Sequence, residues 1–142
     1  MKRFKAAIEA AKEKFLRSKA PASYKEACKK LDIVPIFINH KKKLADYGSA
    51  WCVRRGVRFF LDHKPVKIGT GLYFCVIELN KNYKHDDKSL SILIGHEMGH
   101  ILQIVIDNDV DGRFNNYNPT IDHGTFWKML SHWFGGNKVA EW

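Results

Sequence analysis

The sequence contains few cysteines, no long uninterrupted apolar run and no apolar stretch at its start. Its 142 residues include three cysteines, Cys28, Cys52 and Cys75, an odd number at wide spacing. Such a set forms neither a disulfide framework nor a Cys-x-x-Cys zinc ribbon. A sequence without a disulfide framework fits a protein in a reducing compartment. The charged first residues argue against a signal peptide, and no run approaches the roughly 18 uninterrupted apolar residues of a membrane span. We therefore expect a soluble, intracellular protein.

Acidic residues are scarce relative to basic ones. The 24 Lys and Arg against 15 Asp and Glu give a formal net charge of +9 and a pI near 9.5. This balance favours a polyanionic partner, most obviously nucleic acid, although many small basic proteins bind nothing in particular. No base-specific reader is evident, so single-stranded or structure-selective DNA is expected, with Trp51 or Tyr73 as candidate stacking platforms. The candidate phosphate contacts lie in the middle of the chain: Lys41, Lys42, Lys43, Arg54, Arg55, Arg58, Lys64 and Lys67.

Internal repeats and low-complexity tracts are absent as well. The length suits a single core, and the 45% of hydrophobic and 13% of aromatic residues indicate a folded domain instead of a disordered tail. We expect residues 1–142 to form one domain that acts as a monomer.

The N-terminal part of the chain predicts two helices and a strand. Apolar residues recur at helical spacing between charged ones in residues 2–18, which predicts an amphipathic helix. Ser23 and Glu26 have the form of a capping box, so a second, short helix is expected to begin there. The segment 33–38 is β-branched but contains Pro35. Because proline cannot donate a ladder hydrogen bond, we expect an edge strand or the start of a strand.

The middle of the chain predicts further strands. Two β-rich runs, 50–55 and 57–61, are separated by Gly56 and predict a hairpin. The run 72–79 carries the strongest strand signal. With the helices on either side, these runs indicate an α+β fold with a short, mostly antiparallel sheet.

A long buried helix is predicted over about residues 89–106. Asp86, Asp87 or Ser89 is expected to cap its start. Gly95 and Gly99 lie inside this helix, although glycine in a helix costs about 1 kcal/mol relative to alanine. The two glycines therefore indicate close approach of other backbone or of substrate.

This helix carries the motif His96-Glu97-Met98-Gly99-His100. Residues four apart lie on one helix face, so His96 and His100 can offer imidazole nitrogens to one metal ion. Glu97 is displaced around the helix, so it misses the metal but reaches a water molecule bound there. The spacing is typical of zinc hydrolases, in which the ion lowers the pKa of water to about 7 and the glutamate is the general base. The motif also occurs by chance in non-enzymes.

A catalytic zinc normally has three protein ligands and one open position, so a third donor is needed. His123 is the best candidate, and Asp122 and Glu141 are weaker alternatives. The spacing of the metzincins fails, because Ile106 stands where their third histidine would be.

A final helix is predicted over residues 123–134, with Asp122 or Thr120 as its cap and Gly135-Gly136 at its end. Its buried stripe is expected to consist of Phe126, Leu130 and Trp133.

The connection before this helix begins like an EF-hand loop in residues 107–112. Its twelfth position is Asn118, however, instead of the glutamate that usually completes the calcium sphere. Two interpretations stay open: a calcium site that braces the connection to His123, and a polar loop with scattered acids.

These segments, in this order, resemble the SprT-like metalloprotease family over roughly residues 31–134. Residues 96–100 match the metal helix of that family, and the segment from His123 to Phe126 is similar to its third-ligand segment. Residues 44–51 and 77–80 are similar to the strand segments ahead of its site. The resemblance implies a small zincin-like domain with N-terminal helices, a short sheet, the metal helix and a C-terminal helix that carries the third ligand.

The resemblance also implies an activity. Zinc would be held by His96, His100 and His123, and Glu97 would act on the metal-bound water to hydrolyse peptide bonds. Such domains often act on proteins at DNA. The connection 107–122 is longer than the family pattern, and we expect no C-terminal zinc ribbon of the kind that many relatives carry. Contact with DNA would therefore have to come from the basic surface of the domain itself.

Two other functions use the same residues. One is a nucleic-acid-binding module with a structural zinc ion, which a fourth protein ligand would favour. The other is a zinc hydrolase that acts on a non-protein amide.

Overall fold

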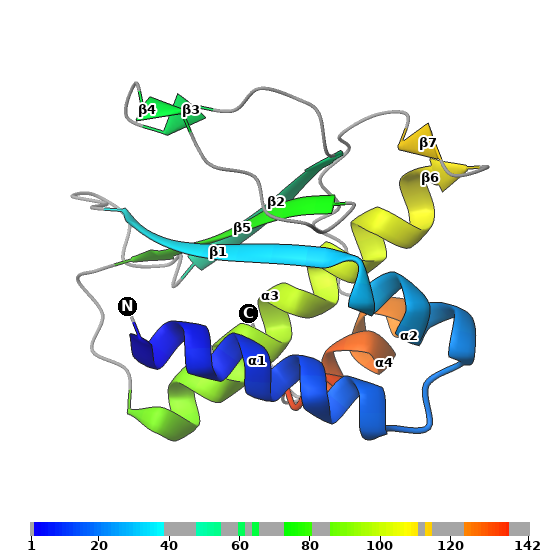
Figure 1. The fold of residues 1–142 in the computed structure, drawn as a ribbon. Helices are drawn as coiled ribbons and strands as arrows, with labels where there is room; N and C mark the ends of the chain where they lie inside the picture. The colour runs from blue at the N-terminus through cyan, green and yellow to red at the C-terminus, as the bar shows by residue number, and fades with distance from the viewer. Residues whose placement is uncertain are drawn as a thin grey trace.

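The computed structural model describes residues 2–38, 48–54, 60–61, 64–65, 73–80, 86–110, 113–114 and 124–136. Within these ranges the protein is α+β, as predicted, with four helices and a three-stranded sheet (Figure 1). The helices are α1 (Lys2–Arg17), α2 (Ala22–Lys29), α3 (Asp87–Asn108) and α4 (Thr125–Trp133). The sheet consists of β1 (Leu31–Ile38), β2 (Gly48–Arg54) and β5 (Tyr73–Asn80). Two small hairpins pair β3 (Phe60–Leu61) with β4 (Lys64–Pro65), and β6 (Asp109–Val110) with β7 (Arg113–Phe114).

The three-stranded sheet is mixed, so the expectation of a mostly antiparallel sheet is wrong. Its order is β1-β5-β2, with β5 in the centre, parallel to β1 and antiparallel to β2. Parallel neighbours need a crossover of a dozen or more residues, and the chain between Ile38 and Tyr73 supplies one. Pro35, opposite Ile77, lies in an edge strand, as its missing N–H predicts.

The turn of the predicted hairpin around Gly56, residues 55–59, lies outside the described residues, so the structure does not test this hairpin. β2 pairs along its whole length with β5, and the two residues of β3 pair with β4. The eight-residue strand β5 offers β2 a long, mostly apolar partner.

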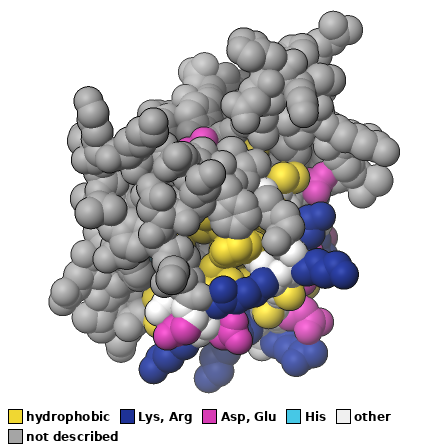
Figure 2. Space-filling view, turned by 90° about the vertical axis from the view of Figure 1, so that its left-hand side faces the viewer, with side chains coloured by type: hydrophobic (Ala, Val, Ile, Leu, Met, Phe, Trp, Pro, Cys, Tyr) yellow, Lys and Arg dark blue, Asp and Glu magenta, His cyan; other side chains and the backbone are white. Residues whose placement is uncertain are grey.

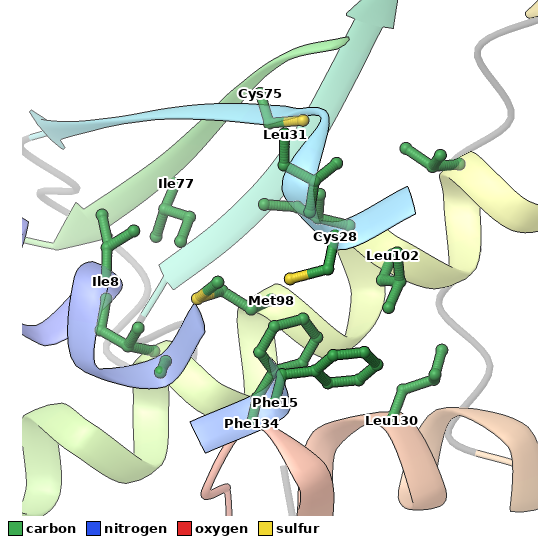
Figure 3. Close-up of a cluster of buried hydrophobic side chains, with 14 of the residues drawn as sticks. Ile8, Phe15, Cys28, Leu31, Cys75, Ile77, Met98, Leu102, Leu130 and Phe134 are labelled. Carbon is green, nitrogen blue, oxygen red and sulfur yellow. The ribbon is translucent and has the colours of Figure 1, made fainter. Parts of the chain in front are cut away.

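The helices cover one face of the sheet, and the hydrophobic core lies between the sheet and the helices (Figure 1). From β5, Cys75, Ile77 and Leu79 alternate toward the helices and are fully buried. Phe15 of α1 and Met98 of α3 reach the same cluster from the helix layer (Figure 3). Burial of each such side chain contributes about 1.5–3 kcal/mol relative to its exposure.

The observed ends of the helices agree with some of the predicted helix ends and N-caps and not with others. α1 matches its predicted range closely. The capping box at Ser23 is wrong, because α2 has Pro21 as its N-cap without a side-chain cap, and Glu26 pairs with Lys29 at 3.0 Å. At the start of α3, the carboxylate of Asp86 accepts a hydrogen bond from the backbone N–H of Ser89 at 2.7 Å, as a cap from this polar segment predicts.

α3 is the central helix and the most apolar one. By length and composition alone it could cross a membrane, although its sequence contains no uninterrupted apolar run of that length. However, 78% of its most apolar stretch is buried inside the protein, and α1, α2, α4 and β2 all pack against the helix. Such burial is typical of the core helix of a folded domain.

Candidate metal centre

The two motif histidines lie on the side of α3 that faces away from the main core. Met98 and Leu102 each follow a histidine by two residues, so they project from nearly the opposite side of the helix. Both are fully buried in the cluster with Phe15 and Leu130. The apolar side of α3 therefore fixes the rotation of the helix and directs His96 and His100 to one common face.

The imidazoles of His96 and His100 converge. Their Nε2 atoms are 3.2 Å apart, and the residues are only 4% and 9% exposed. With zinc–nitrogen bonds of about 2.0–2.1 Å and tetrahedral angles, two ligand nitrogens on one ion lie about 3.3 Å apart. The pair thus fits zinc. The same separation also suits an N–H···N hydrogen bond between neutral imidazoles, so metal analysis distinguishes the two states.

Glu97 lies beside the converging nitrogens. Its Oε1 is 3.8 Å from Nε2 of His96, and both side chains are 5% exposed. A carboxylate at this distance is placed to accept a proton from a water molecule held by the pair. Its burial among imidazoles also keeps bulk water away, which strengthens electrostatic interactions at the site.

Trp127 closes the site from α4, and sequence reasoning missed it. Its indole N–H donates a hydrogen bond to the backbone carbonyl of His96 at 3.1 Å. Its ring stacks on His100 at 5.2 Å with an interplanar angle of 21°, and meets His96 edge-on at 4.7 Å. Trp127 is fully buried, whereas the predicted stripe residues Phe126 and Trp133 are only partly buried. A buried stripe that begins at residue 127 instead of residue 126 would have included Trp127.

Gly95 and Gly99 are explained by the close approach of α4, as their positions predict. A Cβ on Gly95 would lie 2.7 Å from the Cα of Gly136, and one on Gly99 would lie 3.1 Å from the Cα of Ser131. Side chains at either position would push α4 away from α3. The two glycines therefore bring Trp127 within reach of the histidines.

Gln103 is a further polar residue on the same helix face. It lies seven residues after His96, which is nearly two full turns. It is 6% exposed, and its Oε1 has no hydrogen-bond partner among the described residues. A water molecule or an amide N–H could satisfy this oxygen.

The proposed third ligand, His123, lies outside the described residues, as do Asp122 and Glu141. Within the described ranges, no group of three or more His, Cys, Asp or Glu side chains forms a metal-ligand cluster. α4 begins at Thr125 with the extended residue Gly124 as its N-cap, so the predicted helix start at position 123 is wrong by two residues. A cap by Asp122 or Thr120 is excluded by the same observation.

Most of the candidate nucleic-acid residues also lie outside the described residues: Lys41, Lys42, Lys43, Arg55, Arg58 and Lys67. Lys64 belongs to the short strand β4. Arg54 ends β2 directly opposite Tyr73, and Trp51 lies opposite Val76 in the same pair of strands. The sheet thus brings one basic candidate next to one aromatic candidate.

The segment that begins like an EF-hand loop is a hairpin in its described part. Asp107 still lies in α3, and Asp109 pairs with Phe114 across β6 and β7. This backbone differs from a loop that wraps a calcium ion, so the polar-connection interpretation is favoured.

Comparisons with known proteins found no matching family model, no matching curated protein and no matching solved structure.

Proposed function

We propose that the protein is a zinc-dependent endopeptidase of the SprT-like kind. The observation that carries the proposal is the pair of buried imidazoles on α3, whose Nε2 atoms lie 3.2 Å apart with the carboxylate of Glu97 beside them. Two nitrogens at this distance and one adjacent base are two of the three ligands and the general base that metal-assisted hydrolysis requires.

In this proposal His96, His100 and His123 hold the ion. His123 directly precedes Gly124, the N-cap of α4, and α4 is anchored to the histidine pair through Trp127. Zinc, when bound, supplies a Lewis acid that polarises a carbonyl and lowers the pKa of water. Glu97 would act as the general base: its carboxylate would accept a proton from a water molecule at the site and donate it to the leaving amine.

The substrate is proposed to be a protein or peptide, and the fold a small zincin-like domain that acts as a monomer inside the cell. The resemblance of the metal helix and of the segment after His123 to SprT-like proteases supports peptide hydrolysis. Hydrolysis of a non-protein amide would use the same three histidines, so the choice of substrate in the assay separates these two functions.

DNA is proposed as an additional partner, because the chain is strongly basic. Residues 2–30 alone contain ten Lys or Arg and three Asp or Glu. Figure 2 views the side on which α1 and α3 begin, and its described surface mixes both signs, as in the exposed pair Arg3–Asp87 at 2.9 Å. A surface that mixes both signs is typical of a solvated face, so this side is not proposed as the DNA-binding surface. The phosphate contacts are instead proposed for the basic residues between Lys41 and Arg58.

The test combines metal analysis with digestion of a generic unfolded protein. We expect about one zinc ion per chain, cleavage that a chelator abolishes and zinc restores, and faster cleavage with single-stranded DNA. Stoichiometric zinc and DNA binding without cleavage would support a nucleic-acid-binding module with structural zinc. A protein that takes up no zinc would refute both functions. The separation of the two imidazoles would then be explained by an N–H···N hydrogen bond between His96 and His100.

A further inference from the structure

We infer that Trp127 is a positioning residue, whose indole holds the imidazoles of His96 and His100 in the orientation that a shared metal ion requires. The inference rests on the proposed zinc site and assigns a role to a residue outside its ligands. Three contacts of one buried side chain carry it.

The first contact fixes the position of the indole relative to the motif helix. The indole N–H donates to the backbone carbonyl of His96 at 3.1 Å, so Trp127 is attached to α3 at the first ligand itself. This bond joins two segments that are 31 residues apart in the sequence. Among apolar side chains, tryptophan alone combines a wide flat ring with an N–H donor.

The other two contacts restrict the rings. The indole lies nearly parallel to the ring of His100, at 21°, and nearly perpendicular to that of His96, at 70°. The torsion that rotates an imidazole about its attachment is soft, so a histidine ring without neighbours samples a broad range of orientations. With the indole packed against both imidazole rings, such rotation would cause a clash. The Nε2 atoms are thereby kept pointing toward each other.

The same residue also links the pair to the predicted third ligand. Trp127 lies in the first turn of α4, three residues after the N-cap Gly124. Gly95 and Gly99 allow α4 to approach α3 closely enough for this contact. The attachment of Trp127 to His96 therefore determines where the chain enters α4, directly after His123.

Two leucine variants separate positioning from simple packing. Trp127→Leu removes the indole from the histidines. Phe134→Leu is the matched control, because Phe134 is equally buried and stacks on Phe15 of α1 at 4.3 Å. Both variants should lose stability, as expected for truncation of a buried aromatic side chain. Trp127→Phe keeps a flat but smaller ring and removes the N–H donor.

The first measurement is zinc affinity, by competition with a chromophoric chelator at a temperature where every variant is folded. Partners that orient metal-ligating histidines typically contribute 10–100-fold in affinity. We expect Trp127→Leu to weaken zinc binding about 10–100-fold, Trp127→Phe to have an intermediate effect, and Phe134→Leu to match the wild type. Equal zinc affinity of the two leucine variants would overturn the inference while leaving the zinc site intact.

The second measurement needs no metal. In the metal-free protein, NMR should show imidazole protons of His100 shifted by the ring current of the stacked indole. Trp127→Leu should remove this shift, and Phe134→Leu should preserve it. An unchanged His100 spectrum in Trp127→Leu overturns the positioning role. A wild type that binds no zinc, by contrast, refutes the proposed function and the inference together.

Discussion

Gly95 of α3 lies directly against the backbone of Gly136, just beyond the end of α4. A Cβ at position 95 would come within 2.7 Å of the Cα of Gly136, closer than real Cβ atoms approach other heavy atoms. The chain reaches this position through Gly135, which has a φ of +88° and ends α4. The N–H of Gly135 bonds to the carbonyl of His132, and the N–H of Gly136 bonds to that of Ser131, which together form a Schellman motif.

This contact predicts effects of different size on the stability of two alanine variants. Gly95→Ala should destabilise the fold by about 1–3 kcal/mol, because the new methyl group meets backbone that cannot move away easily. Gly99→Ala should be much milder, since its 3.1 Å contacts with Ser131 need only a small shift and alanine gains up to about 1 kcal/mol of helix propensity. Urea unfolding of the metal-free protein measures both. A Gly95→Ala variant as stable as the wild type would contradict the packing of α3 on α4.

The general-base role of Glu97 predicts a separation of binding and chemistry. Glu97→Gln keeps the shape of the side chain but cannot accept a proton, so cleavage should fall about 10²–10⁴-fold. Zinc content should stay unchanged, because Glu97 is not a ligand in the proposed site. Glu13→Gln, on the exposed face of α1, is the control and should keep full activity. Retained proteolysis in Glu97→Gln would remove the residue from the base role.

The metal helix is the part of the fold that the sequence predicts best. Its apolar run, the glycines and the histidine spacing all act within one helix, so local periodicity is sufficient to place His96 and His100 on one face. The central strand β5 and the proline-containing edge strand β1 follow equally from local composition.

The relations between distant segments could not be predicted in this way. The parallel pairing of β1 with β5 depends on a crossover whose course no local pattern encodes. In α4, stripes beginning at Phe126 and at Trp127 both have helical spacing and aromatic residues. Only the packing of α4 on α3 selects the second stripe, because the indole of Trp127 finds a carbonyl acceptor on His96.

The buried thiol of Cys28 predicts a loss of stability at high pH. Burial raises the pKa of Cys28 from 9.0 to about 11 in the folded protein. The folded state therefore holds this proton more tightly than the unfolded state. This contribution to stability is fully present below the unfolded pKa near 9 and is lost as the pH rises toward 11. A shift of this size corresponds to at most about 2–3 kcal/mol.

Comparison with Cys28→Ala isolates this contribution from the titration of lysines and tyrosines. The free energy of unfolding should decline more steeply between pH 9 and 11 in the wild type than in the variant. Alkylation supplies a second measurement: native Cys28, with no exposed surface, should react far more slowly than in the urea-unfolded protein. Parallel pH profiles for wild type and Cys28→Ala would contradict a buried, proton-binding thiol.

The identity of the third ligand is tested by comparing two histidines near α4. His123 precedes the N-cap of α4, whereas His132 lies on the exposed side near its end. His123→Ala should lose stoichiometric zinc, because two imidazoles from α3 alone leave a tetrahedral ion with too few protein ligands. His132→Ala should bind zinc as the wild type does, and His100→Ala should lose it. Zinc analysis after dialysis against a weak chelator reads out all three variants. If His123→Ala retained zinc at wild-type affinity, the third donor would have to be another side chain, and Asp122 would be the next to replace.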